Sequence, residues 1–325
     1  MKAALCKSHG GPDSLVIEEI PEPALLPGLV RLGVHACGVN FPDVLMVAGK
    51  YQVQPPLPFS PGAEVAGEIL EVAADVQHLQ PGQHVIALTA CGGMAEQVCV
   101  SAASVIPTPK NMDYAAAAGF MLTYGTSYHA LKQRAQLKPG ETVLVLGAAG
   151  GVGLAAVELA ALFGAKVIAA ASTDEKLQLA KTHGAAHGIN YTEQNLKEAV
   201  MQITGGKGVD VIYDPVGGEL FDQCMRCMAW NGRLLVIGFA SGEIPKAAVN
   251  LPLLKGFSIV GVFWGSFTQR EPAVHLQNTQ ELLALFAEGK LHPRVTQLFP
   301  LEQAGDALKT LAERKAMGKV IVTVP

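Results

Sequence analysis

The stretch Val143-Leu144-Val145-Leu146-Gly147-Ala148-Ala149-Gly150-Gly151-Val152-Gly153-Leu154-Ala155-Ala156 decides the fold. An apolar, strand-like run leads into three glycines spaced three residues apart, and helix-forming residues follow. Glycines at such a turn let the backbone approach a pyrophosphate, and the helix N-terminus offers free N–H groups and a positive dipole end. This context favours a dinucleotide site over an ordinary glycine-rich turn. The predicted contact residues are Gly147, Ala148, Gly150, Gly151, Val152 and Gly153.

The alternation of strands and helices continues beyond this stretch. Strand-like runs occupy residues 166–170, 208–213 and 232–237, and residues 257–263 are suited to a last strand. Helix-like runs at residues 174–182 and 218–228 separate them. Strands that alternate with helices of this length are typical of a parallel sheet. The sequence therefore predicts an α/β fold with a Rossmann-type doubly wound parallel sheet.

The two ends of the chain have a different texture. Residues 29–35, 64–72 and 83–88 are short strand-like runs punctuated by Gly and Pro, which indicates a partly closed β-barrel. The tail, with a strand-like run at 319–324, is expected to fold back on this first domain. We therefore predict a catalytic domain of residues 1–123 and 264–325, and a nucleotide domain of residues 124–263.

Composition restricts the classes of function. Of the 325 residues, 50% are hydrophobic, and the net charge of −4 shows no basic stripe, so we expect no nucleic-acid partner. No apolar run approaches the ~20 residues that span a bilayer, and the first residues lack a secretory signal. The six scattered cysteines are expected to be reduced thiols. These features predict a cytoplasmic protein.

The residues after the second strand of the nucleotide domain indicate which dinucleotide binds. NAD-binding domains carry an acid about 20 residues past the glycines, whereas this chain has Ala171 there. Ser172, Lys176 and Tyr191 are suited to bind a 2′-phosphate instead, which predicts NADPH. The alternatives are a solvated Lys176 and a Tyr191 phenol satisfied at the surface. Asp174 is counter-evidence, which we interpret as a first-turn acid of a helix.

Several motifs together resemble a known family. They are Gly38-Val39-Asn40-Phe41-Pro42-Asp43, Pro61-Gly62-Ala63-Glu64-Val65-Ala66-Gly67, Thr123–Leu131, the Gly147–Gly153 loop, Ile189-Asn190-Tyr191, Asp214-Pro215-Val216-Gly217-Gly218 and Gly318-Lys319-Val320. In order and spacing the chain resembles the zinc-free quinone oxidoreductase (zeta-crystallin-like) branch of the medium-chain dehydrogenases/reductases. The resemblance implies a GroES-like catalytic domain built from both chain ends, with the Rossmann domain between them, and a homodimer.

The resemblance also implies further cofactor-binding residues. These are Asn40, Thr126, Gly238, Phe239, Phe263, Trp264, Gly265 and Lys319. Phe263 and Trp264 are also suited to wall a planar acceptor, or alternatively to close the core at the end of the last strand.

No metal site is expected. Zinc enzymes of the superfamily carry a cysteine where this chain has Asn40 and a histidine where it has Ala63, so two of the three ligands that catalytic zinc needs are absent. Glu64 is better explained as a structural carboxylate, and Cys91 and Cys99 stand apart from any cysteine run. The remaining pattern, Cys224-Met225-Arg226-Cys227, lies in a predicted helix without a second pair, which favours two buried thiols.

Without zinc, the favoured hydride acceptors are already electron-poor, such as quinones and α,β-unsaturated carbonyls. The catalytic candidates are Asn40, Asp43 and Tyr51. Asn40 is suited to bind the nicotinamide ribose or a substrate oxygen, and Tyr51 to donate a proton or hydrogen bond to a developing oxyanion. The alternatives are that Asp43 caps the following helix, that Tyr51 is a loop aromatic, and that water delivers the proton.

Three functions stay open at this point. The first is an NADPH-dependent quinone reductase, and the second is an NADPH-dependent reductase of enones, enals or enoyl thioesters of the acryloyl-CoA type. The third is a non-catalytic NADPH-binding or RNA-binding protein of the same fold, because a fold does not determine a function.

Overall fold

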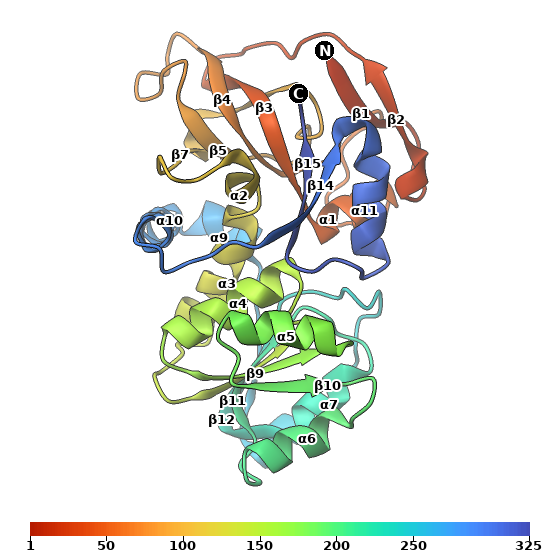
Figure 1. Cartoon of the computed structure of the whole chain (residues 1–325), viewed down its shortest axis with the longest axis vertical. Coiled ribbons are helices and arrows are strands. Elements are labelled where there is room, and N and C mark those ends of the chain that lie inside the picture. The colour runs from red at the N-terminus through yellow and green to blue at the C-terminus, as the bar shows by residue number, and fades with distance from the viewer. The chain divides into compact units, whose positions relative to one another are not determined.

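The computed structural model describes all residues from Met1 to Pro325, in two compact units (Figure 1). The first unit contains residues 1–121 and 293–325, and the second contains residues 122–292. Residues 264–292, which the sequence-based division puts in the first unit, therefore group with the second. They do so because side chains of the 126–134 segment bind them: Gln133 donates to Asn278 at 2.9 Å, and Lys132 pairs with Glu281.

The first unit is built around a seven-stranded sheet in the order β14-β15-β3-β4-β5-β7, with β6 also paired to β3. Its strands are β3 (Leu29–Val39), β4 (Glu64–Val72), β5 (His84–Leu88), β6 (Gln97–Ser101), β7 (Val105–Pro107), β14 (Val295–Pro300) and β15 (Lys319–Thr323). A separate hairpin joins β1 (Lys2–Cys6) to β2 (Leu15–Glu19), and the helices are α1 (Phe41–Val47), α2 (Tyr114–Ala118) and α11 (Ala304–Ala312). The antiparallel pairing of β15 with β3 brings the last strand back to the first unit, as predicted.

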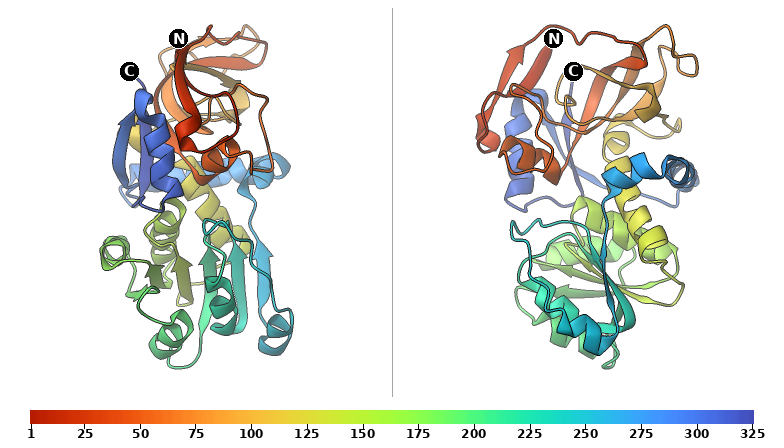
Figure 2. Two further views of the ribbon diagram at one scale, coloured as in Figure 1. Left: turned by 90° about the vertical axis from the view of Figure 1, so that its right-hand side faces the viewer. Right: turned by 180° about the vertical axis from the view of Figure 1, so that it is seen from behind.

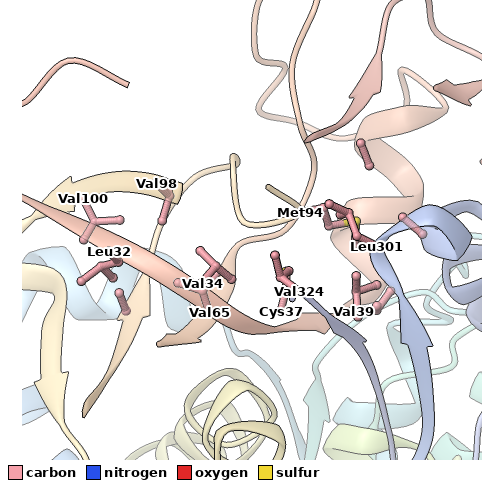
Figure 3. Packing of buried hydrophobic residues seen from close by; sticks show 14 of the residues in the cluster. Leu32, Val34, Cys37, Val39, Val65, Met94, Val98, Val100, Leu301 and Val324 are labelled. Carbon is pink, nitrogen blue, oxygen red and sulfur yellow. The ribbon is translucent and has the colours of Figure 1, made fainter. Parts of the chain in front are cut away.

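Strand β3 organises the core of this unit. Side chains of a strand alternate between its two faces, and Leu32 and Val34 of β3 are both buried on one face. Figure 3 shows them among apolar side chains from several other segments. The labelled partners are Val65 of β4, Val98 and Val100 of β6, and Met94, Leu301 and Val324. Residues far apart in the chain thus share one apolar core.

The second unit is a six-stranded parallel sheet in the order β10-β9-β8-β11-β12-β13. The strands are β8 (Thr142–Leu146), β9 (Lys166–Ala171), β10 (His187–Asn190), β11 (Val209–Asp214), β12 (Met228–Val236) and β13 (Ser258–Gly261). Numbered along the chain, this order is 3-2-1-4-5-6, that of the doubly wound dinucleotide-binding fold. The predicted Rossmann-type sheet is confirmed.

Helices cover both faces of this sheet, as the turned views in Figure 2 show. They are α4 (Gly151–Leu162), α5 (Asp174–Thr182), α6 (Leu196–Ile203), α7 (Leu220–Arg226) and α8 (Asn250–Lys255). The chain enters the unit through the π-helical turns 121–125 and 130–134 around α3 (Thr126–His129), and leaves it after α9 (Trp264–Arg270) and α10 (Pro272–Ala287). None of the helices combines the length and apolar character needed to cross a membrane.

Candidate functional site

The glycine-rich turn lies between β8 and α4, where the sequence predicts it. Gly147 adopts a left-handed backbone conformation with φ of +56°, and Gly150 is the N-cap of α4. A Cβ on Gly153 would lie 2.2 Å from the carbonyl oxygen of Gly147, so only glycine lets the helix approach the turn this closely. The N–H groups of Gly151, Val152 and Gly153 fall in the first turn, where a helix supplies no acceptor of its own. This turn can therefore receive an anionic group.

A second group of residues lies at the ends of the neighbouring strands β9 and β10. The N–H of Tyr191 donates to the carbonyl oxygen of Ala171 at 3.2 Å, which joins the two strand ends. The ammonium of Lys176, in the first turn of α5, donates to the hydroxyl of Ser172 at 3.3 Å. The predicted phosphate-binding residues Ser172, Lys176 and Tyr191 thus share one rim of the sheet.

Asp174 also lies on this rim, and its carboxylate is engaged. It is the first residue of α5, as the sequence predicts, and its Oδ1 accepts a hydrogen bond of 3.2 Å from the side-chain amide of Asn190. Sequence reasoning did not assign Asn190 a role in the site. Its position at the carboxyl end of a parallel strand is the signal that points to it, because ligands of such sheets bind at that edge.

The turns after β11 and β12 continue the same edge. The carboxylate of Asp214 accepts the N–H groups of Val216 and Gly217 at 2.8 and 2.9 Å, and burial raises the pKa of this carboxyl. The N–H of Gly238 donates to the Asp214 carbonyl at 3.4 Å, and Phe239 packs beside Gly217. The predicted cofactor residues Gly238 and Phe239 therefore adjoin the 214–217 turn, whose Pro215 and Val216 side chains in turn lie beside Gly147.

The aromatic pair after β13 divides into one exposed and one buried ring. Phe263 is 64% exposed, whereas Trp264 is 9% exposed. The Trp264 indole packs on Gly125, where an added Cβ would lie 2.6 Å from the ring, and meets the edge of His275. Trp264 thus closes the core, which was the alternative reading, and Phe263 is the ring available to a ligand. Thr126, at the start of α3, is half-buried, and Gly265 lies in the first turn of α9.

In the first unit, Asn40 and Asp43 form the start of α1. The N–H of Asn40 donates to Asp43 Oδ2 at 2.8 Å, and the N–H of Gly62 donates to Asp43 Oδ1 at 3.0 Å. Asp43 thus caps the helix and also holds the 61–64 loop. Its side chain is fully buried, and burial raises its pKa to about 6.

Lys319 completes this cluster from the other end of the chain. Its ammonium donates to the side-chain oxygen of Asn40 at 2.7 Å, to the Val39 carbonyl at 3.3 Å and to Glu64 at 3.4 Å. The amide of Asn40 donates in turn to the Gly38 carbonyl at 3.0 Å. Both ends of the Asn40 amide are therefore engaged, so Lys319 and Asn40 position this part of the unit.

Tyr51 follows α1 and is half-buried. Burial raises the pKa of its phenol, and the Asp43 carboxylate adds to the increase. A phenol with a raised pKa keeps its proton at neutral pH and can donate a hydrogen bond. The side chains of Asn40 and Asp43 are held by hydrogen bonds within the cluster, whereas the Tyr51 hydroxyl takes no part in them.

No group of three or more His, Cys, Asp or Glu side chains is arranged to hold a metal ion. Cys224 and Cys227 are both buried in and after α7, and the Cys227 thiol donates to the carbonyl of Cys224 at 3.4 Å. Burial raises the pKa of both thiols, which disfavours the reactive thiolate.

The sequence matches two family models. Residues 26–110 match the alcohol dehydrogenase GroES-like domain, and residues 151–281 match the zinc-binding dehydrogenase family. The predicted GroES-like architecture of the first unit is thereby confirmed.

Individual relatives cover almost the whole chain. A quinone oxidoreductase-like protein 2 homolog from Nematostella vectensis is 42% identical over 99% of this chain and 88% of its own length. A 2-haloacrylate reductase from a Burkholderia species is 34% identical over 98% of each protein. The crystal structure of Escherichia coli quinone oxidoreductase complexed with NADPH has a TM-score of 0.93 at 29% identity, over 99% of this chain and 100% of the other.

The burial of Asp43 predicts a pH-dependent stability. Its pKa rises from 3.8 to about 6 on folding, so between these values the folded protein holds a proton that the unfolded chain has released. Raising the pH through this window therefore lowers the free energy of unfolding, by on the order of 3 kcal/mol from this one group. Asp43→Asn cannot titrate. The difference between the free energies of urea unfolding of the wild type and of this variant should therefore change between pH 4 and pH 7. Parallel stability curves would contradict the assignment.

Proposed function

Since the chain belongs to the quinone oxidoreductase-like branch of the medium-chain dehydrogenase/reductase family and is an oxidoreductase, we propose that it is a zinc-independent NADPH-dependent reductase of quinones and similar electron-poor acceptors. The family membership confirms the resemblance inferred from the sequence motifs. The observation that carries the proposal is the rim beside the glycine-rich turn, which has Ala171 in place of an acid and a lysine next to Ser172.

The residues present fit NADPH. The first turn of α4 offers N–H groups and a positive dipole end to the pyrophosphate, and Ser172, Lys176 and Tyr191 are suited to hold the 2′-phosphate. An acid at position 171 would repel that phosphate, and the alanine there does not. The E. coli relative was crystallised with NADPH, which supports the same choice of cofactor. We assign the turn residues Gly238 and Phe239 and the exposed Phe263 to the same cofactor.

Zinc independence rests on the donor set. One of the matched families is described as zinc-binding, but this chain carries Asn40 and Ala63 at the two positions where zinc enzymes have a cysteine and a histidine. The Asn40 side-chain oxygen accepts from Lys319, and Ala63 has no donor atom. A catalytic zinc ion needs three protein ligands, and of these three positions only Glu64 carries a side chain suited to bind zinc.

Reduction of a quinone needs a hydride and a proton. Bound NADPH supplies the hydride. A quinone that accepts a hydride also needs a proton to become a hydroquinone, and we assign that proton to the Tyr51 phenol, with solvent water as the alternative source. Asp43 and Asn40 act as positioning residues, because they hold the start of α1, from which the chain runs to Tyr51.

Carbon–carbon double-bond reduction is the second candidate. A hydride from bound NADPH would also saturate an α,β-unsaturated carbonyl, and the Burkholderia relative is named for such an acceptor, 2-haloacrylate. A non-catalytic role, such as RNA binding, has no supporting feature in the charge distribution, since the net charge is −4.

The activity test is NADPH oxidation with 1,2-naphthoquinone, a short enone and acryloyl-CoA, before and after dialysis against EDTA. We expect the quinone to be reduced fastest and its rate to survive chelation, because no step requires a metal. Product analysis separates hydroquinone from saturated carbonyl. Activity that disappears with EDTA and returns with zinc would contradict zinc independence, and no oxidation with any acceptor would contradict the enzyme proposal.

The cofactor test is the Lys176→Ala variant. Removing this cation should lower the ratio of kcat/KM for NADPH over NADH by about tenfold or more, because charge-assisted hydrogen bonds contribute about 1.5–3 kcal/mol. Lys181→Ala, in the last turn of the same helix, is the matched control and should leave the ratio unchanged. An unchanged ratio in Lys176→Ala would remove the phosphate assignment.

We also propose that the chain forms a homodimer through β13. This strand is the last of the parallel sheet, and its Ile259 is 37% exposed. The helix α8, which precedes it in the chain, exposes Leu253 at 81% and Leu254 at 72%, and its N-cap Val249 is 77% exposed. A strand edge next to an exposed apolar surface is suited to pair with a second copy of itself. The mass measured by sedimentation should be twice the 34.0 kDa of one chain, and in the Leu253→Lys variant it should fall to that of one chain. A monomeric wild-type protein would contradict the proposal.

A further inference from the structure

Asn190 is a buried polar residue that the proposed mechanism does not use. It ends β10 and is 6% exposed. Its side-chain oxygen accepts the N–H of Thr192 at 3.2 Å and the hydroxyl of Thr192 at 2.7 Å. Because this oxygen faces two donors, the orientation of the amide is determined, and its NH2 end is the one that meets Asp174 at 3.2 Å.

Asp174 poses an electrostatic problem for a phosphate on the same rim. It lies two residues from Ser172, and Glu175 follows it, so the first turn of α5 carries two acids. Acids stabilise a helix N-terminus, but a phosphate monoester carries a charge of about −1.5 to −2 at neutral pH and is repelled by a nearby carboxylate. A carboxylate free to turn towards the ribose could also bind the two hydroxyls of NADH.

We propose that Asn190 is a specificity-positioning residue, which holds the Asp174 carboxylate against the end of β10 so that the rim accepts a 2′-phosphate. This inference rests on the proposed NADPH dependence. The amide donor binds one carboxylate oxygen directly and limits the rotation of the side chain. Thr192 fixes the amide in turn, and its hydroxyl also lies 3.3 Å from the Ser172 carbonyl. Asp174 thereby still stabilises the N-terminus of α5, while the hydrogen bond from Asn190 keeps its carboxylate in one orientation.

The test uses binding of two nucleotide fragments to the full-length protein. 2′,5′-ADP and 5′-AMP differ only by the 2′-phosphate, so the ratio of their dissociation constants, measured by calorimetry, reports on the rim alone. We expect Asn190→Ala to weaken 2′,5′-ADP binding about tenfold and to leave 5′-AMP within about twofold. Adding Asp174→Asn should restore 2′,5′-ADP binding, because the released charge is then absent.

Two further readouts separate this role from general loss of structure. The effect of Asn190→Ala should diminish at high salt, since charge repulsion at an exposed rim is screened. Thr192→Val, an exposed position, removes a donor to the Asn190 oxygen and should change the ratio in the same direction by a smaller factor, again reversed by Asp174→Asn. This second variant keeps the proposal testable if Asn190→Ala does not fold.

The outcomes distinguish the inference from the function it rests on. A wild-type protein that binds 2′,5′-ADP no better than 5′-AMP would overturn both the NADPH assignment and the role of Asn190. If the wild type prefers 2′,5′-ADP and Asn190→Ala keeps that preference, only the inference fails. A preference that is lost in Asn190→Ala and not restored by Asp174→Asn would also overturn the inference, because Asn190 would then act by another route.

Discussion

The close approach of α4 to the turn after β8 is the constraint on which the proposed cofactor site of the second unit depends. With no side chain on Gly153, the helix start lies against the Gly147 carbonyl, and its free N–H groups face the end of the strand. The parallel order of the sheet then places the ends of β9, β10, β11 and β12 along the same edge. The predicted contacts Ser172, Tyr191, Gly238 and Phe239 all follow the ends of strands along this edge.

The two units differ in where their polar and charged groups lie. The second unit presents unpaired N–H groups and a lysine at an exposed edge, which favours anions. The first unit instead buries a small charged cluster, in which Lys319 lies between the Asn40 amide and the Glu64 carboxylate. Burying charged groups lowers the stability of the folded protein unless they are hydrogen-bonded. Here all three N–H donors of the Lys319 ammonium have acceptors. The cluster therefore ties the start of α1 to the strands β4 and β15.

Local patterns predict the second unit well and the first unit less completely. The Gly147–Gly153 turn, and the alanine at position 171 where an acid would indicate NAD, can be predicted from short stretches of sequence, because strand, turn and helix are consecutive. The contact of Asn40 with Lys319 could not be predicted from a local pattern. Lys319 is 279 residues away in the sequence and reaches Asn40 because β15 pairs with β3. Trp264 shows the same limit: its neighbour Gly125 lies far along the chain, so its burial depends on tertiary packing.

The meeting of β3 with β15 has a consequence for biosynthesis. A ribosome makes the chain from its N-terminal end, so residues 122–292 have all been synthesised while β15 is still untranslated. The nucleotide sheet can fold at that stage, because its six strands are complete. The end of β3 from Ala36 to Val39 meanwhile lacks its partner strand along one edge, and Asn40 lacks its lysine, until β15 is made. Nascent chains stalled before residue 319 should accordingly expose that edge to chaperones.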